Sequence, residues 1–527
     1  MGQRTYNILF HTHTVSGIII SVALYIIFFA GSFSFFRDEI ANWQYGQTVK
    51  VLDEIPDDIN SVVMDMGSEH KLFSRDITIA HYYNEPKINV SIGASKDTLV
   101  LEEDRQGSFY YLDTKNGQHS NYNESYSLGE FLYRLHFFDQ LPYPYGRYLA
   151  GLVAFFFLFA IFTGIAIHWN KIISNFYLFR PRGKLKTLWT DSHTALGVIG
   201  LPFQLVYAVT GAFFLLKFIL IAPSVMGLYE GDQNKLYEDL EYVQPVFEFM
   251  NRPIQTEFDL NSYIVKTKEY WPAFKVTKVQ IFNYGDVNMH LSITGNLDYR
   301  SKFNGIGNVI FKVADNSIVH FKNPLKSSSY LDGVKNVLFR LHLGDYAGLG
   351  LRVVSFVLGL ISCFVIISGI MIWLVARNKK NIPQKKRHFN ENVVRYFLAI
   401  CLSMYPITAL EFILVKIFQP NEGKAFFYST YFIGWLILTI FLIIKNNNGF
   451  TNRSTLLLGS ALGLLVPITN GFVTGKWIWN SYAEGLSQIL FIDVLWLILS
   501  LIGFWVAFQL NRNQNSKVLS TTKRITE

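Results

Sequence analysis

The stretch His13-Thr-Val-Ser-Gly17 is the most informative in the sequence, because it opens a long apolar run and a similar stretch opens another run later in the chain. Its run closes with Gly31-Ser-Phe33. His193-Thr-Ala-Leu-Gly197 opens another apolar run, which closes with Gly211-Ala-Phe213, and the offset is the same at every matched position. A pattern that returns with its spacing intact indicates an internal repeat rather than a chance match.

Two further matches follow in the same order. Leu132-Tyr-Arg-Leu-His136 corresponds to Leu338-Phe-Arg-Leu-His342, and Phe162-Thr-Gly164-Ile corresponds to Ile367-Ser-Gly369-Ile. Histidine, arginine and glycine recur here, not only apolar residues. The sequence therefore predicts a duplicated unit made of a helix, a hydrophilic domain, a short helix and a second long helix.

The composition places this unit in a membrane. The chain has 527 residues, of which 50% are hydrophobic and 16% charged, and its mean hydropathy is +0.23. A single soluble domain is excluded, because apolar runs of the about 20 residues needed to cross a bilayer recur along the chain. We expect a polytopic α-helical membrane protein with about eight spans. The expected spans are Ile8–Phe36, Tyr148–Ile167, Leu196–Ala222, Leu351–Val375, Val394–Phe418, Phe426–Ile444, Leu456–Val473 and Leu486–Leu510.

Basic residues in the short loops predict the orientation. They gather after the second span, after the fourth span and in the tail, whereas the loops on the other side hold only Lys424 and Lys476. The positive-inside rule then places both termini in the cytoplasm. Binding of anionic lipid is an alternative reading of these loops; nucleic acid is not an expected partner. The basic residues are Lys171, Arg180, Arg182, Lys184, Lys186, Arg377, Lys379, Lys380, Lys385, Lys386, Arg387, Arg512, Lys517, Lys523 and Arg524.

Two long hydrophilic stretches, 37–147 and 223–350, fall outside the cytoplasm, and each is long enough for a small α+β domain. Each ends in an amphipathic helix expected to lie along the outer surface, Leu128–Phe138 and Val334–Leu343, with Ser127 and Asp332 as caps. The expected strands are Ile88–Ile92, Thr98–Leu101, Ser108–Leu112, Val276–Phe282, Val287–Thr294, Asn308–Val313 and Ser317–Phe321. The remaining expected segments are spans at 1–36, 148–170, 193–222 and 351–376, cytoplasmic loops at 171–192 and 377–393, four additional helices at 394–510 and a tail at 511–527.

The repeated histidines suggest a cofactor. Imidazole is a good axial ligand for iron, and a helix bundle is where such cofactors are held. His13 and His193 lie near the cytoplasmic ends of their helices, and His136 and His342 lie on the outer side. We expect His13 with His193 to ligate one b-type haem and His136 with His342 a second, which gives an electron path across a layer about 30 Å thick.

Arginines and glycines accompany these histidines. Arg134 and Arg340 stand two residues before theirs, and they are candidates for binding haem propionates or for plain interfacial anchoring. The repeated glycines either give clearance to a macrocycle or allow close helix packing.

His168 breaks the repeat, because its counterpart is Trp373 or a neighbour. It is an alternative to His13 or His193 as a ligand, or a group beside the haem, and His11 lies on a different helix face from His13. Asp493 lies in an apolar run and is a candidate for a proton or quinone role. No sequence motif for covalent haem attachment, nucleotide binding or serine hydrolysis is present.

Over about 1–380 the chain resembles the PepSY-associated transmembrane family, through the His-x-x-x-Gly starts, the L-x-R-L-H segments and the Thr/Ser-Gly-Ile steps. The resemblance implies PepSY-like outside domains, a bacterial inner-membrane location and two b-type haems. The family includes ferrisiderophore reductases and other iron-regulated proteins, and resemblance to the reductases implies a ferric siderophore as periplasmic substrate. The electron donor stays open between a quinol and a separate reductase.

Two other functions remain open at this stage. PepSY-like domains are also compatible with a non-catalytic peptide-binding or regulatory protein. The four additional helices are compatible with a siderophore or iron permease.

Overall fold

A computed structural model describes the chain at residues 1–46, 54–177, 180, 185–240, 245–297, 305–326, 329–379, 381–421 and 423–526. It divides into two compact units. The first comprises Met1–Thr48, Tyr126–Leu220 and Arg352–Glu527, and the second comprises Val49–Ser125 and Ile221–Leu351. Of the basic residues expected to set the orientation, Arg182, Lys184 and Lys380 lie outside the described residues.

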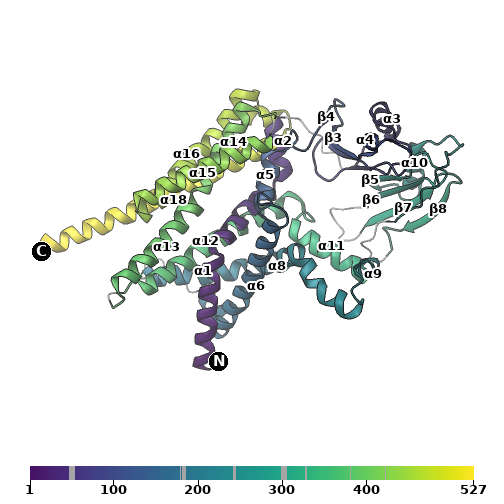
Figure 1. The fold of residues 1–527 in the computed structure, drawn as a ribbon. Coiled ribbons are helices and arrows are strands. Elements are labelled where there is room, and N and C mark those ends of the chain that lie inside the picture. The colour runs from purple at the N-terminus through teal and green to yellow at the C-terminus, as the bar shows by residue number, and fades with distance from the viewer. Residues whose placement is uncertain are drawn as a thin grey trace. The chain divides into compact units, whose positions relative to one another are not determined.

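The first unit is helical, and the described residues include eight helices long and apolar enough to cross a membrane, as expected. Four of these helices carry the repeated motifs: α1 (Gln3–Ser34), α6 (Tyr145–His168), α8 (Leu185–Leu228) and α12 (Gly348–Arg377) (Figure 1). Apolar side chains favour these segments in lipid, and the helix satisfies each backbone N–H and C=O internally. Both α1 and α8 begin before the predicted starts, so His13 and His193 lie two to three turns inside their helices.

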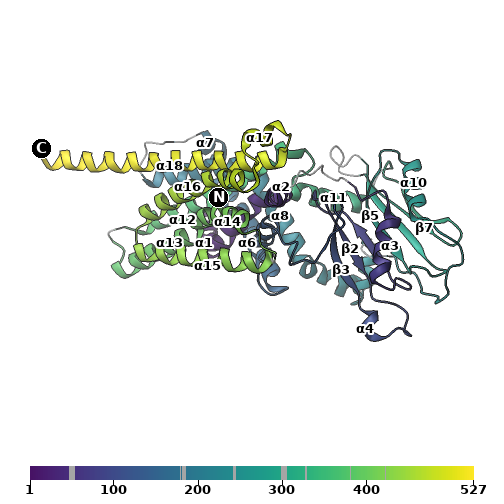
Figure 2. The same ribbon diagram turned by 90° about the horizontal axis from the view of Figure 1, so that it is seen from above.

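The four additional spans also belong to this unit. They are α13 (Gln384–Leu402) with α14 (Met404–Phe418), α15 (Gly423–Lys445), α16 (Asn448–Thr474) and α18 (Ser487–Thr526), with the short α17 (Ile478–Ala483) before α18 (Figure 2). The span predicted as one helix breaks at Ser403. Pro406 explains the break, because it has no N–H to donate to the carbonyl of Leu402.

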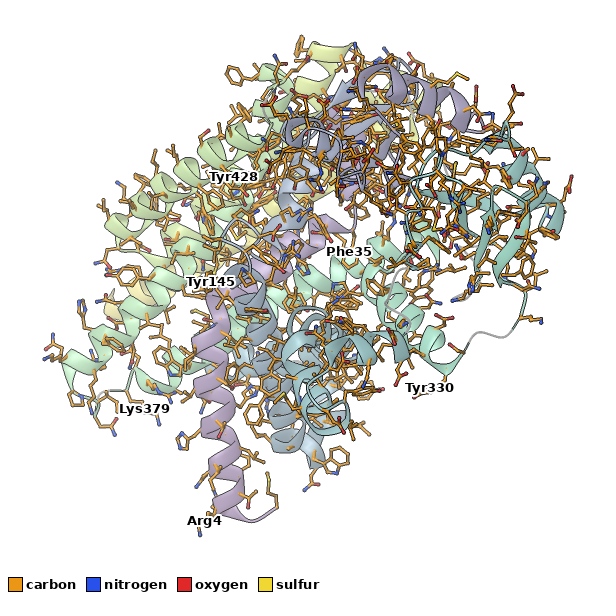
Figure 3. All side chains as sticks on the ribbon, turned by 45° about the vertical axis from the view of Figure 1, so that its right-hand side comes forward. Arg4, Phe35, Tyr145, Tyr330, Lys379 and Tyr428 are labelled. Atoms are coloured by element: carbon orange, nitrogen blue, oxygen red, sulfur yellow. The ribbon has the colours of Figure 1, made fainter. Side chains whose placement is uncertain are left out.

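Two short helices complete the described part of this unit near α1. Helix α2 (Arg37–Tyr45) follows α1, and α5 (Leu128–Leu135) precedes α6. Ser127 caps α5 as predicted, since its side chain accepts a hydrogen bond from the Glu130 N–H. Figure 3 marks the two ends of α1 with Arg4 and Phe35, and marks the start of α6 with Tyr145. The short α7 (Ile172–Tyr177) continues beyond α6.

The second unit contains one antiparallel sheet of eight strands in the order β4-β3-β2-β1-β5-β6-β7-β8. Its strands are β1 (Ile77–Ala80), β2 (Lys87–Ile92), β3 (Ser108–Asp113), β4 (His119–Ser120), β5 (Lys275–Phe282), β6 (His290–Asn296), β7 (Ile306–Lys312) and β8 (Ser317–Lys322). Its helices are α3 (Ile59–Glu69), α4 (Glu102–Arg105), α9 (Gln233–Asp239), α10 (Leu260–Tyr270) and α11 (Tyr330–Leu343).

The sheet corrects the expectation of two separate outside domains. Strands β1 and β5, one from each hydrophilic stretch, pair at the centre, with Ile79 opposite Val279. Each stretch alone would leave its first strand as an open edge, and pairing the two edges satisfies both rows of backbone groups. Side chains from both stretches share one apolar core.

The helices of the two stretches also cap each other. Asp58 caps α3 and Asp259 caps α10. The Asn261 Oδ1 accepts from the Ile59 N–H at 2.8 Å, and the Asn60 Oδ1 accepts from the Leu260 N–H at 3.0 Å. Each asparagine therefore serves the partner helix, which ties the two stretches together.

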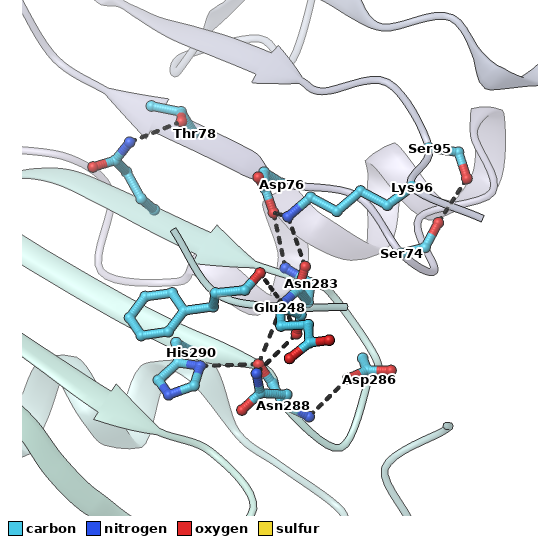
Figure 4. Close-up of polar contacts among 12 residues, drawn as sticks. Ser74, Asp76, Thr78, Ser95, Lys96, Glu248, Asn283, Asp286, Asn288 and His290 are labelled. Carbon is cyan, nitrogen blue, oxygen red and sulfur yellow. Dashed lines mark hydrogen bonds and ion pairs between the residues drawn. The ribbon is translucent and has the colours of Figure 1, made fainter. Parts of the chain in front are cut away.

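A polar cluster beside the central strands adds a second tie (Figure 4). The Lys96 ammonium donates to the Asp76 carboxylate at 2.7 Å and to the Asn283 Oδ1 at 2.6 Å. The Asn283 amide in turn donates to the carbonyls of Phe247 and Glu248. Asp76 and Lys96 come from the first stretch and Asn283 from the second.

Other local predictions in this unit were wrong. Thr98–Leu101 forms no strand, β1 was not predicted, and β6 begins at His290 rather than Val287. The cap of α11 is Ser329, whose hydroxyl accepts from the Asp332 N–H, so Asp332 lies inside the helix. Asp332 instead forms an ion pair with Lys322 at 2.5 Å.

Candidate functional site

His13 of α1 lies against α6. Its Nδ1 is 2.9 Å from the Ala160 carbonyl oxygen and 3.2 Å from the Thr163 Oγ1. A carbonyl only accepts hydrogen bonds, so Nδ1 carries the proton and Nε2 keeps its lone pair. Nε2 has no hydrogen-bond partner among the residues that the structure describes. A histidine held in this way through Nδ1 is prepared to ligate a metal through Nε2.

His193 of α8 repeats this arrangement against α12. Its Nδ1 is 2.9 Å from the Val365 carbonyl oxygen and 3.1 Å from the Ser368 Oγ. Its Nε2 likewise has no hydrogen-bond partner within the described ranges. The acceptors Val365 and Ser368 occupy the repeat positions of Ala160 and Thr163, so both halves of the chain hold their histidine by the same contacts.

The glycine after each hydroxyl residue gives the ring its space. A Cβ atom on Gly164 would lie 3.3 Å from the His13 Cε1, and one on Gly369 would lie 3.2 Å from the His193 Cε1. Both distances are too short for an ordinary methyl contact. Glycine therefore suits these two positions, because a larger side chain would crowd a histidine ring.

The two rings lie close to each other, nearly at right angles. Their centroids are 6.4 Å apart and their planes are inclined by 77°. At this separation, and with neither Nε2 hydrogen-bonded within the described residues, the two imidazoles would be able to hold one metal ion between them, and their role as haem ligands stays a prediction.

His168 and His11 are the two histidines that compete for this site. His168 is the last residue of α6 and interacts electrostatically with His13 and His193. It has no hydrogen-bond partner in the described part of the chain, and its role, as an alternative ligand or as a group beside the haem, stays a prediction. His11 is exposed and its ring contacts Phe10, which places it away from the His13–His193 pair.

His136 ends α5 and lies over α1. Its Nδ1 is 2.8 Å from the Ile27 carbonyl oxygen, and a Cβ atom on Gly31 would lie 2.5 Å from that nitrogen. Gly31 is therefore required for the ring to approach the helix. Burial lowers the pKa of the His136 imidazole, which favours its neutral form.

An ion network surrounds the His136 segment. The Glu130 carboxylate accepts from the Arg37 Nε at 2.7 Å and from the Arg134 Nε at 2.6 Å, and Arg134 also donates to Asp139 at 2.6 Å. Burial raises the pKa of Glu130, but the two guanidinium groups outweigh it and the net shift is downward. Arg134 thus lies in a carboxylate network, and its contact with a propionate stays a prediction.

His342 and Arg340 lie in α11 of the second unit. The Arg340 Nε donates to the Asp345 Oδ1 at 2.6 Å, with the same spacing as Arg134 and Asp139 in the first half. The expected pairing of His342 with His136 and the propionate role of Arg340 stay predictions.

Sequence reasoning found the histidines and the arginines before them but missed their partners: Thr163 and Ser368 contact histidines, and Asp139 and Asp345 pair with arginines. Thr163 and Ser368 stand directly before the repeated glycines, and Asp139 and Asp345 each stand three residues after a repeated histidine. The signal was present in the repeat itself. A hydroxyl or carboxylate that recurs beside a candidate ligand is a candidate partner for that ligand.

Comparison with known proteins agrees with the architecture. The family described as PepSY-associated TM region matches residues 10–376, which hold all four repeat-matched histidines. Uncharacterized protein PA4219 of Pseudomonas aeruginosa is 24% identical over 241 residues, or 44% of this chain. This chain covers only 60% of that relative's length. Because the family match takes in well over half of the chain, the protein belongs to the PepSY-associated transmembrane family.

Proposed function

We propose that this protein is a di-haem b electron-transfer protein that reduces a ferric siderophore, or another ferric chelate, on the periplasmic side of the bacterial inner membrane. The observation that carries the proposal is the His13–His193 pair, with a ring separation of 6.4 Å and Nδ1 of each ring bonded to a carbonyl of a neighbouring helix. This arrangement supports ligation through both Nε2 atoms.

The chain's own residues would bind and orient the cofactor. Bound haem supplies a carrier that accepts and gives up one electron at a time. His13 and His193 provide the nitrogens near the cytoplasmic side, and Thr163 and Ser368 help to fix the tautomer and tilt of each ring. His136 and His342 are the proposed ligands on the outer side.

The orientation belongs to the same proposal. The basic loops support a cytoplasmic location for both termini, and the sheet-bearing second unit would then be periplasmic. A quinol or a separate reductase gives up electrons, and each ferric ion that gains one electron becomes ferrous. The ferrous ion binds hard oxygen ligands more weakly, which releases it from the chelate.

The test is a reduced-minus-oxidised absorbance spectrum of the purified full chain, with a haem stoichiometry measurement. We expect two b-type haems per chain, and one in the His13→Ala and His193→Ala variants. His11→Ala is the matched control and keeps both, because His11 is exposed and away from the pair. A wild-type chain without haem would overturn the proposal and favour a peptide-binding or permease role. Two haems without reduction of a ferric chelate would remove the substrate assignment.

A further inference from the structure

A fully buried cluster of Trp43, Lys416, Asn470 and Asp493, here called the Lys416–Asp493 cluster, lies in the first unit. The Asp493 carboxylate accepts from the Trp43 Nε1 at 2.8 Å and from the Asn470 Nδ2 at 2.9 Å. The Lys416 ammonium donates to the Trp43 carbonyl oxygen, and it lies 4.4 Å from the centre of the Trp43 ring.

This cluster joins α2 to three of the additional helices. Trp43 belongs to α2, whereas Lys416, Asn470 and Asp493 belong to α14, α16 and α18. Both carboxylate oxygens of Asp493 have donors, and the Lys416 ammonium has the Trp43 and Gln44 carbonyls as acceptors. Buried charges satisfied in this way stabilise one arrangement of the helices, because breaking one contact leaves another charge uncompensated.

Helix α2 in turn contacts α5. The Gln44 Oε1 accepts from the Leu128 N–H at 2.7 Å, at the first residue of α5. The Arg37 Nε donates to the Glu130 carboxylate at 2.7 Å. A substitution that displaces α2 at the Lys416–Asp493 cluster would therefore also disturb the contacts that Arg37 and Gln44, near the two ends of α2, make with α5.

The additional helices also contact α5 directly. The Phe131 ring of α5 lies 4.9 Å from the Tyr431 ring and 5.8 Å from the Phe427 ring, both on α15. All three side chains are fully buried. Helix α5 is thus held from two directions, and His136 is the residue at its C-terminal end.

We propose that the four additional helices position His136 as a haem ligand. In this proposal the Lys416–Asp493 cluster holds α2 in place, and α2 in turn holds α5. This inference rests on the proposed haem function. In it Lys416 and Asp493 are positioning residues, and neither contacts the haem. Asp493 then has a structural role, and not the proton or quinone role that its apolar setting suggests. Each of its carboxylate oxygens already accepts a hydrogen bond within the bundle.

The experiment compares the two haems within one molecule. The haem proposed for His136 and His342 is here called the outer haem, and the one proposed for His13 and His193 the inner haem. The spectrum of the His136→Ala variant first identifies the outer haem. In Lys416→Met we expect at least a twofold loss of outer-haem occupancy, or a clear shift of its midpoint potential, while the inner haem keeps its spectrum and potential. Lys445→Met is the matched control, because it removes the same charge from an exposed position on α15, and both haems should stay unchanged.

Phe131→Leu is a milder second variant at the α5–α15 contact and should affect the outer haem alone. The inner haem reports on folding of the same preparation. Unchanged outer haem in both Lys416→Met and Phe131→Leu would overturn the inference, as would equal loss of both haems. A haem-free wild-type chain would instead overturn the proposed function.

Discussion

At the scale of single residues, the informative atoms are those that hold the histidines. His13 and His193 would be ordinary membrane histidines if their Nδ1 atoms bonded to water or to lipid. Both instead donate to a carbonyl beside a hydroxyl, on α6 in one half and on α12 in the other. A neighbouring acceptor fixes the tautomer of an imidazole and makes its other nitrogen a stronger electron donor.

This gives a prediction for Thr163 and Ser368. Thr163→Val and Ser368→Ala each remove one oxygen near a ligand Nδ1–H, so the ligand donates less to iron and the ferric form loses stabilisation. A hydrogen bond worth about 0.5–1 kcal/mol corresponds to an upward shift of about 20–40 mV in a one-electron potential. A redox titration measures the shift in the inner haem.

The conservative Thr163→Ser variant serves as the control, because it keeps the hydroxyl and should restore the wild-type potential. A downward shift, or an equal shift in Thr163→Val and Thr163→Ser, would contradict an electronic role for this oxygen.

At the scale of elements, the contact between α2 and α5 includes one buried carboxylate, that of Glu130. Glu130 joins Arg37 of α2 to Arg134 of α5, and its pKa is lowered on balance although burial raises it. A carboxylate whose pKa is lower in the folded chain contributes stability above its unfolded value of about 4.3. That contribution is lost as the pH falls through the lowered folded value.

Glu130→Gln should therefore destabilise the protein by about 2–3 kcal/mol at pH 7, because two guanidinium groups lose their shared charge in a buried site. The difference from wild type should shrink below a pH of about 4.3, where the unfolded carboxyl is protonated. Thermal unfolding of the full chain in detergent at both pH values measures it. Glu484→Gln removes an exposed carboxylate paired with Lys476 and should cost less than about 1 kcal/mol. A deficit independent of pH would exclude the ionised form as the cause.

Elements were predictable where a pattern repeats over many residues. Apolar runs located all eight spans, and alternation located β2, β5 and β8 within one or two residues. Strand β1 has four residues, Ile77–Ala80, which is the shortest length at which alternation indicates a strand. The break at Ser403 and the cap at Ser329 depend on single backbone hydrogen bonds, which a periodic pattern does not record.

At the scale of the whole molecule, the duplication acts differently in the two units. In the first unit, each half supplies one histidine to a shared pair. In the second, each half supplies a row of strands to a shared sheet. The sequence predicted a repeat but not how its two halves combine. Strands β1 and β5 are separated by almost two hundred residues, and the pairing of edges far apart leaves no local pattern.

The antiparallel pairing of β1 with β5 leads to the last prediction. Thr78 lies opposite Gln280 in the sheet, and the Gln280 amide donates to the Thr78 hydroxyl at 3.4 Å. Residues directly opposite in an antiparallel pair have Cα atoms about 4.5–5.5 Å apart, which falls within the range that a disulfide spans. Cysteines at these two positions should therefore form a disulfide under mild oxidation. After cleavage at a protease site inserted between Tyr177 and Leu185, the two fragments then stay joined until a reductant is added.

The matched control places the second cysteine on β8 instead, as Thr78→Cys with Ser317→Cys. Ser317 belongs to the same stretch as Gln280 but lies at the far edge of the sheet, beyond the reach of a disulfide from β1. The native Cys363 and Cys401 are buried and should not compete. If the two hydrophilic stretches folded as separate domains, neither pair would form efficiently. A bond in the Thr78–Gln280 pair alone requires the single sheet, in which each half covers the open edge of the other.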